Sequence, residues 1–258
     1  LVGAACAGGH LEALTEWVLG LERLDVVRLM DPALVGGGFI QGQRLMEVFA
    51  RHVPDTPIQD LPIAYGCTAT DLESGESVWL REGSLADAVR ASIALPGLFT
   101  PVRRDGRLLI DGGVTEPVPV GLCRALGAER VIAVNINSDI VGRRVSQQVS
   151  SQTSDSLTRL VDRLHPGLGE SLRTLVNAYP GREPTPGLMD VVTGTIHIMQ
   201  YRITDDHLRA DPPEVLISPR VTDVALMDFH RAEEAIQAGR EAAEAALHPR
   251  KGDGGIKL

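Results

Sequence analysis

Hydrophobic and polar positions along this chain form blocks that predict strands and helices in turn. Short runs of Val, Ile and Leu bounded by Gly or Pro predict strands, and longer stretches with apolar residues three or four positions apart predict helices. The predicted strands are residues 63–70, 77–80, 107–110, 130–136 and 214–217. The predicted helices are residues 1–19, 43–51, 85–93, 118–126, 155–164, 188–208 and 228–247. Strands that alternate with helices indicate an α/β fold.

Two helix ends carry recognisable capping residues. Ser84 precedes the helix predicted at 85–93, and Asp87 follows three positions later, which predicts an N-cap. Gly127 follows the helix predicted at 118–126, where a glycine commonly ends a helix.

Residues 137–187 differ in composition from the rest of the chain. They are rich in Ser and Pro, which predicts a mobile insertion with one or two short helices. A surface excursion is one interpretation of this segment. A cap over a substrate entrance is the functional alternative.

Composition and charge narrow the class of protein. The chain has 258 residues, of which 43% are hydrophobic, so residues 1–258 can form one domain around one large core. A net charge of -9 and a pI near 5.3 argue against a nucleic-acid partner and against general attraction to anionic membranes. The cysteines lie far apart in sequence, which predicts free thiols and a reducing, cytoplasmic setting. A secretory leader before Leu1 stays open as an alternative.

The segment 107–113, Arg-Leu-Leu-Ile-Asp-Gly-Gly, carries the strongest candidate for chemistry. Apolar residues lead to Asp111, and Gly112 and Gly113 then remove side chains beside it and allow a sharp turn. An Asp at the carboxyl edge of an α/β sheet lies where active sites occur. The alternative is a structural strand end followed by a tight turn.

Four segments resemble the patatin-like phospholipases, and in particular the bacterial lipid acyl hydrolases related to neuropathy target esterase. The central one, Ala-Ser-Ile-Ala-Leu-Pro-Gly-Leu-Phe-Thr-Pro-Val at 91–102, precedes Asp-Gly-Gly at the distance usual in that family. The others are residues 66–72, 227–229 and 238–240. The resemblance implies a lysophospholipase-like, three-layer α/β/α fold with a mainly parallel central sheet.

The same resemblance implies a Ser-Asp dyad, in which Asp111 is the general base and Gly112 and Gly113 complete its motif. The family's nucleophilic Ser belongs to a Gly-x-Ser-x-Gly elbow. Residues 1–10 resemble the helix after that elbow, so the Ser is expected about one helical turn upstream of Leu1, with the first strand and the oxyanion loop also upstream. The implied activity is hydrolysis of a phospholipid, a lysophospholipid or a simpler ester. No metal and no organic cofactor are implied.

Further candidates surround this motif. Ser92, Pro96 and Phe39 are expected to line the substrate pocket, and Ser92 lacks the glycines of a nucleophile elbow. The glycines at 36–38 lack the Lys of a phosphate-binding loop and predict a flexible connection. Related bacterial members often carry Asn where this chain has Glu116, which would raise the pKa of Asp111 if it faced the same pocket.

Two other functions stay open at this stage. An acyltransferase of related architecture would pass the acyl group to an alcohol, although such enzymes commonly use His as the base. A non-catalytic lipid-binding protein would keep the fold without the nucleophile. All three functions imply a lipid or ester ligand and peripheral contact with membranes, and none of them fixes the oligomeric state.

Overall fold

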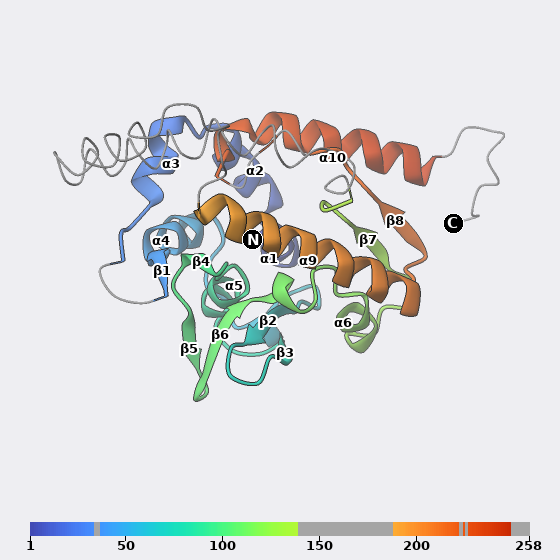
Figure 1. Ribbon diagram of the computed structural model, residues 1–258. Coiled ribbons are helices and arrows are strands. Elements are labelled where there is room, and N and C mark those ends of the chain that lie inside the picture. Colours follow the sequence, from blue (N-terminus) through green and yellow to red (C-terminus); the bar gives the residue numbers. More distant parts are fainter. Residues whose placement is uncertain (34–36, 139–187, 222–223, 225–226, 249–258) are drawn as a thin grey trace, which may run out of the picture. The chain divides into compact units, whose positions relative to one another are not determined.

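The computed structural model describes residues 1–33, 37–138, 188–221, 224 and 227–248 (Figure 1). The chain divides into two compact units, of which one comprises residues 1–141 and 199–258 and the other residues 142–198. The candidate site and its supporting elements belong to the first unit. The insertion predicted at 137–187 and the helix predicted at 155–164 lie outside the described residues, apart from residues 137 and 138.

The largest sheet has four antiparallel strands in the order β3-β2-β6-β5. Their bounds are β2 Cys67–Asp71, β3 Ser77–Leu80, β5 Val102–Arg104 and β6 Arg107–Asp111. The sequence did not lead us to predict β5, although Asp105-Gly106 is a typical hairpin turn. Both turn residues adopt a positive φ, 50° and 78°, as a two-residue hairpin requires.

Two shorter sheets supply the parallel pairing expected of the fold. In one, β1 Gly38–Ile40 pairs with β4 Gly97–Phe99, and in the other β7 Ile132–Val134 pairs with β8 Val215–Ile217. Neither β1 nor β4 was predicted, because each begins with a glycine, which is uncommon in strands. Parallel pairing therefore occurs in these short sheets, whereas the largest described sheet consists of the hairpins β2-β3 and β5-β6, which pair antiparallel through β2 and β6.

Most of the described α-helices lie within the predicted blocks, although the helix at Arg23–Leu29 was not predicted. The α-helices are α1 Val2–Ala7, α2 Leu11–Leu19, α3 Arg23–Leu29, α4 Gln43–His52, α5 Leu85–Ser92, α6 Val120–Ala125, α9 Leu188–Ala210 and α10 Ala232–Leu247. The 3-10 helices are η1 Ile58–Asp60, η2 Gly112–Val114 and η3 Phe229–Arg231. The single helix predicted at 1–19 is wrong, because Gly9 adopts a φ of 77° and separates α1 from α2.

Both predicted caps are present. The Ser84 hydroxyl accepts a hydrogen bond of 3.0 Å from the Asp87 amide at the start of α5. Gly127 follows α6 with a φ of 96°. These local signals predicted helix ends because a cap involves residues within one turn of each other.

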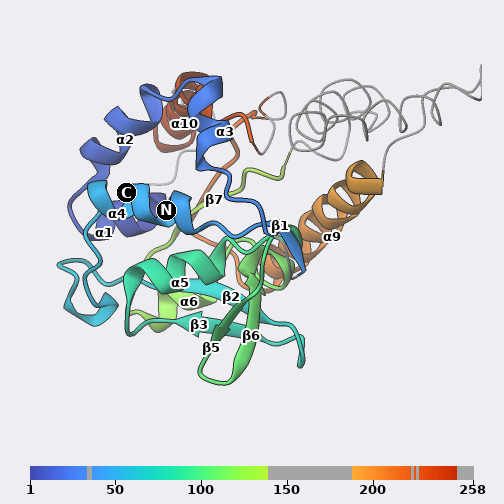
Figure 2. The same cartoon turned by 90° about the vertical axis from the view of Figure 1, so that its left-hand side faces the viewer.

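Helices cover both faces of the four-stranded sheet. Ala69 of β2 is fully buried in the cluster that includes the apolar residues of α5, and Figure 2 shows α5 lying along β2. Side chains alternate along a strand, so Thr68 and Thr70 face the other side. Trp79 is the cross-strand partner of Thr68, and a Cβ placed on Gly121 of α6 would lie 3.8 Å from its ring. α6 therefore covers the second face.

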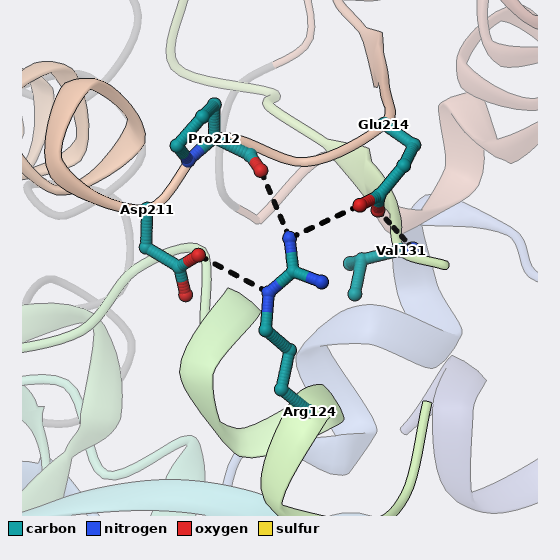
Figure 3. A network of polar contacts seen from close by, with 5 residues as sticks. All are labelled: Arg124, Val131, Asp211, Pro212 and Glu214. Carbon is teal, nitrogen blue, oxygen red and sulfur yellow. Dashed lines mark hydrogen bonds and ion pairs between the residues drawn. The ribbon is translucent and has the colours of Figure 1, made fainter. Parts of the chain in front are cut away.

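One arginine joins three separate parts of the first unit (Figure 3). The Arg124 guanidinium on α6 donates to Asp211 Oδ1 at 3.1 Å, to the Pro212 carbonyl at 3.0 Å and to Glu214 Oε1 at 3.3 Å. The Val131 amide, just before β7, donates to Glu214 Oε2 at 2.6 Å. That amide and then Arg124 hold the pKa of Glu214 below its usual range. The end of α9 and the start of β8 are therefore attached to α6 and β7.

We expect Gly38→Ala to lower the free energy of unfolding by about 1–3 kcal/mol, the usual effect of overpacking. A Cβ at Gly38 would lie 2.3 Å from the carbonyl carbon of Phe99 on the paired strand, and backbone cannot give way as a side chain does. Urea unfolding at equilibrium measures the change. Gly20→Ala is the matched control, because the nearest atoms to its Cβ would be 3.5 Å away and its φ is −83°. Equal losses in both variants would contradict the steric argument.

Candidate active site

Asp111 ends β6 and is fixed through its backbone on two sides. It pairs with Ala69 on β2, and its amide donates to the Ala94 carbonyl, just after α5, at 3.0 Å. The Thr70 hydroxyl donates to the Asp111 carbonyl at 2.9 Å and lies 2.9 Å from the Thr115 hydroxyl. The position of this carboxylate is therefore set by a sheet, a helix end and the turn that follows it.

Gly112 and Gly113 are both required by the space around them. A Cβ on Gly112 would lie 2.2 Å from both the carbonyl oxygen and the Oγ1 of Thr68. The Gly113 amide donates to Asp111 Oδ1 at 2.6 Å, which fixes the orientation of the carboxylate. A Cβ on Gly113 would lie 2.9 Å from that same oxygen and 2.5 Å from the side-chain nitrogen of Gln200.

Burial makes Asp111 a stronger base than an exposed aspartate. It raises the pKa of Asp111 to about 6, and the hydrogen bond from the Gly113 amide acts in the opposite direction. One carboxylate oxygen is occupied by Gly113. A general base near neutral pH needs both a raised pKa and a free oxygen, so Asp111 fits that role chemically.

A half-buried thiol, that of Cys67, lies on the same face of the sheet as Asp111. Cys67 is two residues from Ala69, the partner of Asp111, and side chains two apart share a face. Burial raises the pKa of the Cys67 thiol, whereas hydrogen bonds with Tyr65 and then Ser92 act to lower it. Ser92, the last residue of α5, thus bonds to a structural neighbour of the site.

The other predicted pocket residues, Pro96 and Phe39, lie on or beside the segment that leads from Ala94 into β4. Pro96 lies two residues after Ala94 in a turn that leads into β4, and it is half-buried. Phe39 lies on β1, which pairs with β4, and its side chain is 60% exposed. Gly38 belongs to β1 and packs against the backbone of β4, so this part of the glycine run is a strand rather than a flexible connection. Leu34, Val35 and Gly36 lie outside the described residues.

Glu116 is held on the opposite face from Cys67 by two specific donors. The Trp79 indole donates to Glu116 Oε2 at 2.8 Å, and the Ser77 hydroxyl donates to the same oxygen at 2.9 Å. Both donors belong to β3, so the carboxylate attaches the turn after Asp111 to that strand. The pKa of Asp111 is raised by its own burial, and Glu116 has a structural role here.

Two residues of α9 that the sequence did not single out lie in the first unit. Gln200 contacts Gly113, and Thr204, one helical turn later, is 1% exposed. The sequence offers one signal in hindsight: a Gln and a Thr spaced as i and i+4 lie on one face of a long helix. No local pattern says which strand end that face meets.

Two kinds of feature are absent from the part of the chain that the structure describes. None of its helices combines the length and apolarity needed to cross a membrane. No three His, Cys, Asp or Glu side chains in it gather closely enough to hold a metal ion.

Comparison with known proteins identifies a matching family and several related sequences. The family described as patatin-like phospholipase matches residues 2–124. An uncharacterized NTE family protein of Mycobacterium tuberculosis is 30% identical over 96% of this chain and 80% of its own length. A second one is 30% identical over 93% of this chain and 38% of its own length. A patatin-like phospholipase domain-containing protein of Caenorhabditis elegans is 42% identical over 83 residues, which are 31% of this chain and 6% of that protein.

The raised pKa of Asp111 predicts a specific dependence of stability on pH. An unfolded Asp titrates near 4, so the native state keeps a proton between about pH 4 and pH 6 that the unfolded chain has released. The resulting stabilisation is fully present below about pH 4 and is lost as the pH rises through about 6. Asp111→Asn removes this titration. At pH 7 the free energy of unfolding of the variant should therefore be higher than that of the parent by on the order of 2–3 kcal/mol.

Urea unfolding of the parent and of Asp111→Asn at several pH values measures this difference. Asp60→Asn, at an exposed position of η1, is the control for removing one carboxylate. A difference between Asp111→Asn and the parent that is constant from pH 4 to pH 7 would contradict the burial of a charged Asp111.

Proposed function

This chain belongs to the patatin-like phospholipase family, and we propose that it is a serine esterase that hydrolyses lipid acyl esters with a Ser-Asp dyad. Members of this family have a three-layer α/β/α fold, and the family supports lipid acyl hydrolysis in general. The observation that carries the finer proposal is the position of Asp111: a half-buried carboxylate at a strand end, with a raised pKa and one oxygen bound by a backbone amide.

The dyad works in two symmetrical halves. The Ser hydroxyl attacks the ester carbonyl while Asp111 accepts its proton, and collapse of the tetrahedral intermediate releases the alcohol, which takes that proton. Asp111 then accepts a proton from water as the water attacks the acyl-enzyme. The carboxylic acid leaves, and the proton returns to the Ser. Backbone amides of an oxyanion loop would stabilise the negative charge in both halves.

The nucleophile in this proposal precedes Leu1 and belongs to a Gly-x-Ser-x-Gly elbow. The position of α1 supports it: a Cβ on Gly3 would lie 3.3 Å from the Tyr65 ring, and Leu1 packs against the core cluster that Tyr65 and Cys67 also contact. α1 thus begins beside the strand that pairs with Asp111. A residue one turn before α1 would lie on the approach to that carboxylate.

The proposed substrates are phospholipids, lysophospholipids or simpler carboxylic esters. The exposed ring of Phe39 and the turn at Pro96 would contact the acyl chain, because Pro96 lies on the segment that continues from Ala94 and Phe39 lies on β1, the strand that pairs with β4. Ser92 would act as a structural hydroxyl at the pocket wall. The described residues carry no feature that selects one lipid head group.

Two alternatives give different results in simple assays. An acyltransferase would form an ester when an alcohol acceptor competes with water, whereas a hydrolase would release mainly free fatty acid. A non-catalytic lipid-binding protein would not react with a fluorophosphonate, a reagent that labels activated serines. Labelling that depends on Asp111 supports the dyad.

In the protein that includes the elbow, Asp111→Asn should reduce kcat/KM for a p-nitrophenyl ester by roughly 10²–10⁴-fold, the usual loss for a general base. Asn keeps the acceptor for the Gly113 amide but cannot accept the proton. The parent kcat/KM should also rise through about pH 6, because only ionised Asp111 is a base.

Ser92→Ala is the matched control near the same site. It removes a hydroxyl that bonds to Cys67 and should change kcat/KM far less than Asp111→Asn does. An inactive Ser92→Ala together with an active Asp111→Asn would reject the assignment of both residues.

A further inference from the structure

One face of α9 is fixed along the first unit from residue 200 onward. Gln200, Thr204 and Leu208 are spaced by four and therefore share a side of the helix. Leu208 packs against the cluster formed by α6 and β7, and Thr204 is 1% exposed. Asp211, next after the helix, is bound by Arg124 at 3.1 Å. The position of Gln200 is therefore set by the burial of Thr204, the packing of Leu208 and the hydrogen bond to Asp211 that follows the helix.

The Gln200 amide and the Asp111 carboxylate border the same space beside Gly113. A methyl group on Gly113 would meet the Gln200 side-chain nitrogen at 2.5 Å and Asp111 Oδ1 at 2.9 Å. The two polar groups thus occupy the space that a side chain at residue 113 would otherwise fill. Glycine at this position allows a helix from the distant part of the sequence to approach the carboxylate.

We propose that Gln200 is a positioning residue for Asp111, which covers the Gly113 side of the carboxylate and keeps its other oxygen directed toward the nucleophile. This inference rests on the proposed function of Asp111 as general base. A neutral amide suits the role, because it excludes water from a buried carboxylate and offers N–H donors without adding charge. A second carboxylate at this place would oppose ionisation of Asp111.

The charged and titratable groups on the elements around Asp111 are bound to other partners. Glu116 is bound by Trp79 and Ser77 on β3, and the Cys67 thiol bonds with Tyr65 and Ser92. At the far end of β2, the Asp71 carboxylate lies 3.9 Å from Arg107, and from α5 the Arg90 guanidinium binds the Gln41 and Thr100 carbonyls. Gln200 is the side chain that α9 brings against Gly113.

The first test uses substitutions of Gln200 and the pH dependence of kcat/KM. Gln200→Glu should move the acid limb of the profile upward by about one pH unit, since a carboxylate then faces Asp111. Gln200→Ala should move the limb downward, since water reaches Asp111, and should lower kcat about tenfold with little change in KM. Unchanged limbs in both variants would overturn the proposal.

Gln59→Glu is the matched control for added charge. Gln59 is exposed, its oxygen accepts from the Gly83 amide, and glutamate retains that oxygen. Gly83 precedes the start of α5, whereas Asp111 bonds just beyond its other end, about 12 Å along the helix. This variant should leave the acid limb in place, and a shift equal to that of Gln200→Glu would show a general charge effect instead.

The second test uses the shared space at Gly113. Gly113→Ala should impair activity, and combining it with Gln200→Ala should recover part of that loss, because the added methyl then occupies the space of the missing amide. If the effects of the two substitutions on activity were strictly additive, the proposed contact between Gln200 and Gly113 would be wrong. The pH dependence of unfolding, compared with and without Asp111→Asn in the Gln200→Glu background, reports the pKa of Asp111 without any assay of activity.

The two hypotheses fail in different ways. If Asp111→Asn keeps full activity, the proposed function is wrong, although the unfolding experiment still measures whether Gln200 shifts the Asp111 pKa. If Asp111→Asn is inactive while every Gln200 variant behaves like the parent, the dyad stands and Gln200 has no positioning role.

Discussion

The arrangement around the site depends on holding one half-buried carboxylate at the end of a strand. Burial of Asp111 is unfavourable for its charged form, and the Gly113 amide offsets this in part with a hydrogen bond of 2.6 Å. That bond needs the tight turn of η2. This turn needs a glycine at position 112, because a Cβ there would lie 2.2 Å from the carbonyl oxygen and the Oγ1 of Thr68. The sheet register, the threonines of β2 and the end of α5 all serve to hold this turn. The cost of this arrangement is that the charged form of Asp111 is less favourable here than in water, so its pKa is raised to about 6.

Short-range signals in the sequence predicted much of this arrangement. Asp111 followed by two glycines indicated a strand end with a turn, and the Ser84 cap and Gly127 marked helix ends correctly. Each of these features involves residues within a few positions of each other, so the chemistry of the residue types is sufficient. The Asp105-Gly106 hairpin was equally local and could have been predicted.

Contacts between distant residues were beyond such signals. Nothing near Gln200 in sequence indicates that it lies beside Gly113. The short strands β1 and β4 form only because they pair with each other. The direction of Glu116 is a similar case. The sequence left open whether its carboxylate faces Asp111, and the indole of Trp79 on a neighbouring strand decides the question. Register between strands, rather than residue type, determines these positions.

The Arg124 network also affects how well the protein tolerates insertions and deletions between Arg124 and Asp211. Arg124 and Asp211 are 87 positions apart, and Val131 and Glu214 are 83 apart, yet each pair is joined by a hydrogen bond. These bonds therefore hold the two ends of the intervening sequence together. The entropy of closing a flexible loop grows only with the logarithm of its length, by about 0.6 kcal/mol for each doubling. A change in the length of this stretch therefore costs little in loop closure, provided that the part of α9 that carries Gln200 keeps its place beside Gly113.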